Sequence, residues 1–156
     1  EAGLKNAVSY YERAATSGLA DAQYAMAQLY ANGAGGKKQD EAEARRFLVL
    51  AARQNYDTAQ LDLGTWMING RGGERDEKEG FEWLRRAATG GNAAAQNRLG
   101  KLYMNGIGTE PDSISAAAWF ILARRAGLFD PIMKDFFDGL TDEEMKQALQ
   151  RANRLR

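Results

Sequence analysis

One pattern of apolar and polar positions occurs three times along the chain. In its clearest copy, residues 57–92, an apolar stripe at three- and four-residue spacing predicts a helix. A second stripe follows a glycine-rich turn and predicts another helix. Gln23, Gln60 and Gln96 mark the same position in successive copies, which lie 37 and 36 residues apart. A period of this length predicts helix pairs that stack to complete a shared core.

The two stripes of each copy define the predicted core. Small residues recur at two points of the repeat, where helix backbones are expected to approach closely, and an aromatic series is expected to fill the gaps between successive pairs. The small positions are Ala27, Gly64 and Gly100, then Ala44, Gly80 and Ala116. The aromatic series is Tyr10, Phe47, Trp83 and Trp119. The remaining predicted core comprises Ala22, Met26, Leu29, Tyr30, Leu48, Ala51, Ala52, Ala59, Leu63, Trp66, Met67, Leu84, Ala87, Ala88, Ala95, Leu99, Leu102, Tyr103, Phe120 and Ala123.

Local signals mark where these helices begin and end. An Asn-Gly pair closes the first helix of each copy, since both residues tolerate the left-handed backbone conformation. An aspartate then opens each second helix as an N-cap. The pairs are Asn32-Gly33, Asn69-Gly70 and Asn105-Gly106, and the aspartates are Asp40, Asp76 and Asp112.

Both ends of the chain depart from the full repeat. Residues 4–15 match a second helix without its first helix, so we expect either a lone N-terminal cap or a chain trimmed upstream, and we favour trimming. After Gly127, Asp130-Pro131 predicts an N-cap with proline in the first turn, and Thr141 with Glu144 predicts a capping box. We expect a terminal cap with two apolar faces: Ile132, Met133, Phe136 and Phe137, then Met145, Ala148, Leu149, Ala152 and Leu155.

We therefore expect a single domain over residues 1–156. Its predicted parts are a half repeat or N-terminal helix at 1–19, full repeats at 20–56, 57–92 and 93–127, and capping helices at 128–156.

Charge and composition remove several classes of function. Lys plus Arg equals Asp plus Glu at 21 each, so no net field attracts nucleic acid or an anionic membrane, and no apolar run is long enough for membrane insertion. The chain has no Cys and no His, which removes thiolate nucleophiles, imidazole bases and the common zinc ligands. We expect no enzyme activity, no cofactor and no metal site.

Three other patterns have plain structural explanations. The recurring Asn-Gly-x-Gly sequence is explained by helix termination, although such a turn before a helix can bind anions. The arginine pairs 45–46, 85–86 and 124–125 are offset by Glu41, Glu43, Glu82 and Glu12, which favours a solvated face over nucleic-acid binding. The acidic residues 142–144 suit the first turn of a helix, so we do not expect them to act as catalytic carboxylates.

Together, the Ala-Gln, Leu-Gly, Asn-Gly-x-Gly, Asp, aromatic and Ala-Ala elements resemble the Sel-one-like repeat, a relative of the tetratricopeptide repeat, over about residues 4–127. The resemblance implies an all-α, right-handed superhelical solenoid of antiparallel helix pairs that acts as a scaffold or adaptor. It also implies a bacterial protein, exported to the periplasm or envelope, with the cytoplasm as the alternative. Ala27, Phe47 and Trp66-Met67 depart from the family pattern in packing volume.

In related tetratricopeptide arrays the first helix of each pair lines the concave face, which predicts where a partner binds. Matched positions on the three first helices give an apolar strip with a polar rim, suited to a peptide or protein segment. The predicted groove residues are Tyr24, Gln28, Leu61, Thr65, Ile68, Asn97, Lys101 and Met104. The alternative is that these residues pack against adjacent first helices or against the terminal cap.

We therefore expect a protein-interaction module, an envelope scaffold or regulator that takes part in signalling. The alternatives are a structural spacer within a larger chain, self-association through the N-terminal helix, and a hydrolytic enzyme. The last is the weakest, because the antibiotic-hydrolysing members of the family are rich in Cys pairs, which this chain lacks.

Overall fold

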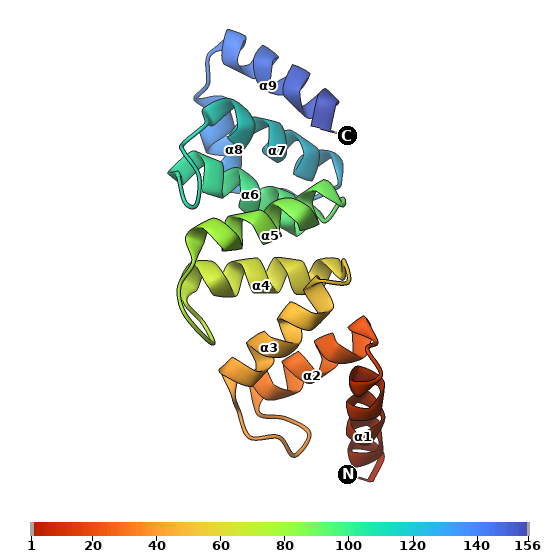
Figure 1. Ribbon diagram of the computed structural model, residues 1–156. Coiled ribbons are helices and arrows are strands. Elements are labelled where there is room, and N and C mark those ends of the chain that lie inside the picture. The colour runs from red at the N-terminus through yellow and green to blue at the C-terminus, as the bar shows by residue number, and fades with distance from the viewer. Residues whose placement is uncertain (1, 156) are drawn as a thin grey trace. The chain divides into compact units, whose positions relative to one another are not determined.

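The computed structural model describes residues 2–155, apart from the side chains of Ala2 and Leu4, and every regular element in that range is an α-helix (Figure 1). The all-α prediction is confirmed. The helices are α1 (Ala2–Thr16), α2 (Ala20–Asn32), α3 (Glu41–Ala52), α4 (Asp57–Asn69), α5 (Glu77–Thr89), α6 (Ala93–Asn105), α7 (Ser113–Arg125), α8 (Pro131–Asp138) and α9 (Asp142–Leu155).

Contacts within the chain group it into two compact units, Glu1–Asp76 and Glu77–Arg156. The first unit contains α1–α4 and the second contains α5–α9. In the first, α1 packs on α2, α2 on α3 and α3 on α4 (Figure 1). In the second, α5 packs on α6 and α6 on α7, and α7 is then covered by both α8 and α9. The boundary separates the two helices of the second repeat, so the units do not coincide with the repeats.

The predicted helix ends are found in the structure. Gly33, Gly70 and Gly106 close the first helices with φ of 65°, 71° and 67°, in the left-handed region. The Asp40 side chain accepts a hydrogen bond from the Glu43 amide, and the Asp112 side chain accepts one from the Ser115 amide. These N-caps are confirmed. Asp76 directly precedes α5, and its capping role stays a prediction.

The second glycine of the recurring turn has a packing role. A Cβ atom on Gly72 would lie 2.5 Å from the Glu41 carbonyl oxygen, and one on Gly108 would lie 2.3 Å from that of Glu77. Both glycines also have positive φ, which side-chain-bearing residues rarely adopt. In each unit, this turn therefore lies directly against the start of the preceding second helix, and glycine is the residue that fits there.

The glutamine that marks each repeat joins neighbouring helices. The Nε2 atoms of Gln23, Gln60 and Gln96 donate to carbonyl oxygens eight residues earlier, at 3.5, 3.1 and 3.2 Å. The acceptors are Ala15, Ala52 and Ala88, which lie near the ends of α1, α3 and α5. All three glutamines are buried. This polar residue therefore belongs to the core, a role that the sequence pattern did not predict.

Most of the predicted core is buried, with Leu48, Leu63, Leu84 and Leu99 among the largest fully buried side chains. The aromatic series is only partly correct. Trp119 is buried, but Phe47 and Trp83 are half-buried. The prediction for Tyr10 is wrong, because its ring is 57% exposed on α1. Leu29, Tyr30 and Tyr103 of the predicted core are also half-buried.

The capping helices α8 and α9 begin as predicted, but fewer of their apolar side chains are buried than the sequence predicted. Thr141 and Glu144 exchange both hydrogen bonds of the capping box, at 2.9 and 3.1 Å. In α8, Met133 is fully buried, whereas Ile132 is 63% exposed and was wrongly assigned to the apolar face. The described side chains that α9 buries are Ala148 and Ala152, and Leu149 and Leu155 point largely outward. Small residues let α9 lie close to α7, so its larger apolar side chains stay at the edges.

Candidate partner-binding surfaces

The predicted groove residues of the first unit lie on α2 and α4. Leu61, Thr65 and Ile68 are spaced by four and three residues, so they share one face of α4. All three are half-buried, as are Tyr24 and Gln28 on α2. The buried residues of α4 lie at other positions and include Leu63 and Met67. The helix thus keeps an apolar pair, Leu61 and Ile68, partly accessible beside its core face.

A hydrogen bond joins α2 to α4 at this surface. The Tyr24 hydroxyl donates to Oδ2 of Asp62 at 2.7 Å, and its ring centroid lies 5.4 Å from that of Tyr56. Burial of Tyr24 and its hydrogen bond to the carboxylate raise the pKa of the phenol far above its usual value. Thr65 turns its hydroxyl onto the Leu61 carbonyl oxygen at 2.9 Å. The polar groups at this surface are therefore fixed by intramolecular bonds.

The predicted groove residues of the second unit lie on α6, where the terminal cap contacts two of them. Asn97 is only 9% exposed, and its Nδ2 donates to Oδ2 of Asp130 at 2.9 Å. The Nζ atom of Lys101 lies 2.7 Å from the same oxygen. Hydrogen bonds from Asn97 and Lys101 lower the pKa of Asp130 to about 2. Met104 is half-buried.

Helix α8 extends this contact along α6. Asp130 also caps α8, because its Oδ1 accepts from the Ile132 amide at 2.9 Å. The next buried residue, Met133, packs against Gly100, where an added Cβ would lie 3.1 Å from the Met133 Cε. For Asn97 and Lys101 the structure thus shows contact with the terminal cap. Their binding to a partner stays a prediction, and such a partner would compete with Asp130.

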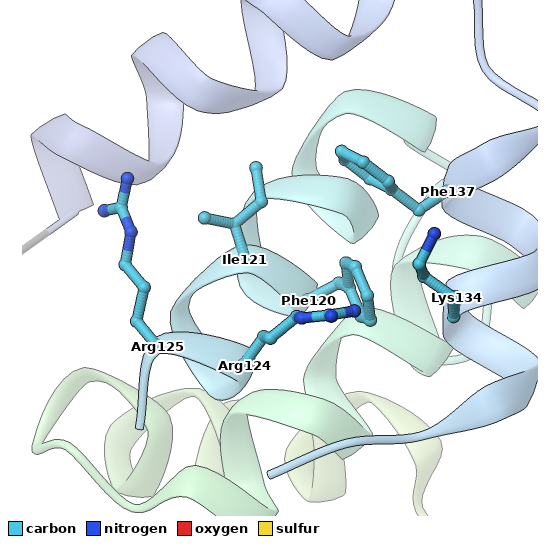
Figure 2. Close-up of a pocket in the computed structure, with 6 residues that line it drawn as sticks. All are labelled: Phe120, Ile121, Arg124, Arg125, Lys134 and Phe137. Atoms are coloured by element: carbon cyan, nitrogen blue, oxygen red, sulfur yellow. The ribbon is translucent and has the colours of Figure 1, made fainter. Parts of the chain in front are cut away.

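A hollow between α7 and α8 was missed by the sequence analysis (Figure 2). Its volume is about 410 Å³, and three apolar and three cationic side chains line it, with apolar atoms forming most of its surface. The Phe120 and Phe137 ring centroids lie 5.2 Å apart, and Lys134 pairs with Asp138 at 2.5 Å. The lining residues are Phe120, Ile121, Arg124, Arg125, Lys134 and Phe137.

The arginine pair at this hollow differs from the other arginine pairs. Arg46 pairs with Glu43, and Arg85 pairs with Glu82 at 2.9 Å. Within residues 2–155, neither Arg124 nor Arg125 has a carboxylate partner, although Arg124 lies over the Phe129 ring at 5.1 Å. Two unpaired cations beside an apolar floor suit a partner that presents acidic and apolar side chains. The sequence signal was an arginine pair without a nearby acidic residue on its own helix.

Two further kinds of site are absent from the described residues. No group of three or more His, Cys, Asp or Glu side chains in that range is arranged to hold a metal ion. No helix described there combines the length and apolar composition needed to cross a membrane.

Comparison with solved structures identifies similar folds. A Sel1 repeat protein from Oxalobacter formigenes matches with a TM-score of 0.79 and 28% identity, over 94% of this chain and 61% of that one. A protective antigen with an SLR fold, present in uropathogenic Escherichia coli strains, matches with a TM-score of 0.69 and 26% identity, over 96% and 40% of the two chains. The chain therefore spans less than two thirds of either protein.

Helicobacter pylori cysteine rich protein B matches with a TM-score of 0.63 and 19% identity, over 83% of this chain and 92% of that chain, which shows a shared fold. A search of curated protein sequences returns no match. The structural neighbours confirm the predicted class, an all-α solenoid.

The family comparison agrees with the sequence resemblance. The Sel1 repeat model matches four consecutive segments, residues 4–19, 20–56, 57–92 and 93–128. Proteins built from these repeats generally act as non-catalytic scaffolds for protein–protein interaction. Because the matches cover most of its length, the chain belongs to the Sel1 repeat family.

Proposed function

We propose that this protein is an interaction module that binds a peptide or protein segment on the first helices of its repeats. The observation that supports this most is the pair Leu61 and Ile68, which share one face of α4 and remain partly accessible. Apolar side chains left accessible on a structured helix suit an amphipathic or extended partner segment. Thr65 shares their face of α4, Gln28 occupies the matched repeat position on α2, and both supply polar atoms for orientation.

In the second unit, we propose that a carboxylate of the bound segment replaces Asp130 as the acceptor for Asn97 and Lys101. Asn97 and Lys101 both donate to one Asp130 oxygen, so a carboxylate on the partner would find the same two donors if Asp130 moved away. Met104, seven residues beyond Asn97 on α6, supplies the apolar contact there. We therefore propose a partner segment that carries apolar side chains and at least one Asp or Glu.

The proposal is tested by selecting peptides from a displayed library on the purified protein and measuring their affinity by calorimetry. The double variant Leu61→Asp with Met104→Asp should weaken binding at least tenfold and leave the helical circular dichroism unchanged, because both side chains are partly exposed. Leu149→Asp is the matched control, since it places the same charge on an accessible leucine of α9. Equal affinity of the wild type and the double variant would place the binding site elsewhere.

We also propose that the module acts in the periplasm or envelope of a bacterial cell, as a scaffold or regulator. The support is similarity to a protein described as a protective antigen of uropathogenic Escherichia coli. Fractionation of the native host, with antibody against this protein and markers for periplasm and cytoplasm, tests this directly. Recovery with the cytoplasmic marker alone would contradict it.

A further inference from the structure

A second hollow lies in the C-terminal unit, at the turn between α5 and α6. Its volume is about 400 Å³. Its lining includes the apolar side chains of Trp119 and Leu122, the turn glycines and a buried glutamine. The residues that matter to its chemistry are Gln96, Gly91, Trp119, Leu122, Arg125 and Ala126. None of them is a predicted groove residue.

Gln96 has an unused acceptor at this hollow. The residue is 8% exposed, and its Nε2 atom donates to the Ala88 carbonyl oxygen at 3.2 Å, which fixes the orientation of the amide. Its Oε1 atom is buried and has no hydrogen-bond partner among the described residues. Buried polar atoms in folded proteins are nearly always paired, so an exception at the wall of a hollow calls for an explanation.

The first repeat shows how the same position is satisfied. Gln23 occupies the position of Gln96, and its Oε1 accepts from Nε2 of Gln54 at 2.8 Å. The same Gln54 nitrogen also donates to the Gly18 carbonyl oxygen at 2.8 Å. One primary amide thus satisfies both acceptors at the corner between α1 and α2.

In the third repeat this amide is missing from the chain. Counted from the aromatic position of each second helix (Tyr10, Phe47, Trp83 and Trp119), the residue that corresponds to Gln54 is Ala126, and Gly91 corresponds to Gly18. The methyl side chain of Ala126 carries no hydrogen-bond donor and is too short to reach Gln96. Both Ala126 and Gly91 line the hollow, so it lies where a glutamine side chain stands in the first repeat, and Leu155 of α9 also borders it.

We propose that this hollow binds a primary amide, the side chain of a glutamine presented by a partner protein. Its NH₂ group donates to Oε1 of Gln96 and to the Gly91 carbonyl oxygen, as Gln54 does in the first repeat. Its carbonyl oxygen accepts from Arg125, which has no ion pair in residues 2–155. Its methylene groups pack on Trp119 and Leu122, and the Arg125 charge excludes lysine and arginine side chains.

A direct test uses N-acetylglutamine methylamide as the probe in an amide NMR titration of the full chain. The Gln96 side-chain NH₂ and the backbone amides of Gly91 and Ala126 should shift saturably, with a dissociation constant in the millimolar range. N-acetylmethionine methylamide has a side chain of similar shape that carries no primary amide, and it should cause no saturable shift. Equal shifts from both probes, or none from the glutamine probe, would overturn the proposal.

Variants at Ala126 make the test independent of the probe. Ala126→Gln restores the arrangement of the first repeat, so the thermal midpoint should exceed that of Ala126→Met by about 2–4 °C. Ala126→Gln should also abolish the shifts caused by the glutamine probe. If the midpoint rises while the wild type shows no saturable binding, the hollow is a hydrated packing defect and the proposal is wrong.

Discussion

At the same repeat position, the two units make a similar hydrogen bond to a carboxylate, but the surface around that bond is open in one unit and covered in the other. Tyr24 in the first repeat and Asn97 in the third each donate to a carboxylate two helices further along the chain, Asp62 on α4 and Asp130 at the start of α8. Asp62 lies within α4, and the face around it stays partly accessible. Asp130 is the N-cap of α8, and that helix goes on to cover α6 through Met133.

The first helix of a repeat can thus either present a surface or be covered. A donor at this position reaches a carboxylate in both cases, so the bond alone does not decide accessibility. What decides it is the residue that follows: Met133 packs on Gly100, whereas α4 leaves Leu61 and Ile68 at its edge. We therefore expect the covered surface in the C-terminal unit to contribute more to stability, and the open surface in the N-terminal unit to contribute more to binding.

The largest expected effect comes from removing the side chain that covers α6. Met133→Ala should lower the free energy of unfolding by about 2–5 kcal/mol, because Met133 is fully buried and its loss leaves a cavity beside Gly100. Urea denaturation followed by circular dichroism measures this. Ile132→Ala, at the exposed neighbouring residue, should change it by less than about 0.5 kcal/mol. Similar losses from the two variants would mean that α8 does not pack as described.

The next prediction compares the two carboxylates. Asp130→Asn keeps a capping side chain but removes the charge that Lys101 and Asn97 bind, so it should lower the free energy of unfolding by about 1–3 kcal/mol. Asp62→Asn should lower it by about 0.5–1.5 kcal/mol, since Asp62 accepts one neutral hydrogen bond from Tyr24. Urea denaturation at pH 7 tests both variants. A larger loss from Asp62→Asn would reverse the comparison.

The free energy of unfolding at acidic pH should report on the Asp130 contact. Its folded-state pKa of about 2 lies below the usual value near 4, so the unfolded chain binds more protons between these pH values. The stabilisation is complete above about pH 4 and is lost as the pH falls towards 2. Between those limits the wild type should lose about 1–2 kcal/mol more than Asp130→Asn.

Protonation of Asp112 should lower the stability of both the wild type and Asp130→Asn over the same acidic range. Burial opposes its ionisation, but bonds from Ser115 and Arg151 outweigh burial and lower its pKa as well. The wild type and Asp130→Asn share this loss, and their difference isolates Asp130. Parallel pH profiles would show that Asp130 is not held by α6.

The smallest expected effect lies at Tyr24. Tyr24→Phe should lower the free energy of unfolding at pH 8 by about 1 kcal/mol through the lost hydrogen bond to Asp62. Because the folded-state pKa of Tyr24 is raised, its neutral form contributes stability below pH 10 that is lost at higher pH. The gap between the wild type and Tyr24→Phe should therefore narrow above pH 10. Tyr10→Phe, at an exposed ring, should have no effect, and a constant gap for Tyr24→Phe would contradict the bond between the Tyr24 hydroxyl and Asp62.

The parts of the fold that sequence predicted are those that local chemistry determines. Gly33, Gly70 and Gly106 end helices because of their own backbone freedom, and Asp40 caps a helix that starts at the next residue. The repeated stripes then predict the core, since stacked copies bury the same positions. The resemblance to the Sel-one-like repeat rests on the same helix-ending, capping and core residues.

The parts that sequence missed depend on contacts between distant segments. Asp130 was predicted as an N-cap, which uses one oxygen, but its other oxygen reaches Asn97, 33 residues earlier. Tyr10 was placed in the core by its repeat position, although its ring is exposed in the structure. The hollow between α7 and α8 depends on how closely two helices approach, and a stripe of apolar residues does not specify that distance.

The central claim is that the open surface of α2 and α4 binds a partner segment, and amide NMR mapping of a library-selected peptide tests it most directly. We predict that the largest shifts occur at Tyr24, Leu61, Thr65 and Ile68, with smaller shifts at Met104. Shifts confined to α3, α7 or α9, with α2 and α4 unchanged at saturating peptide, would contradict the account.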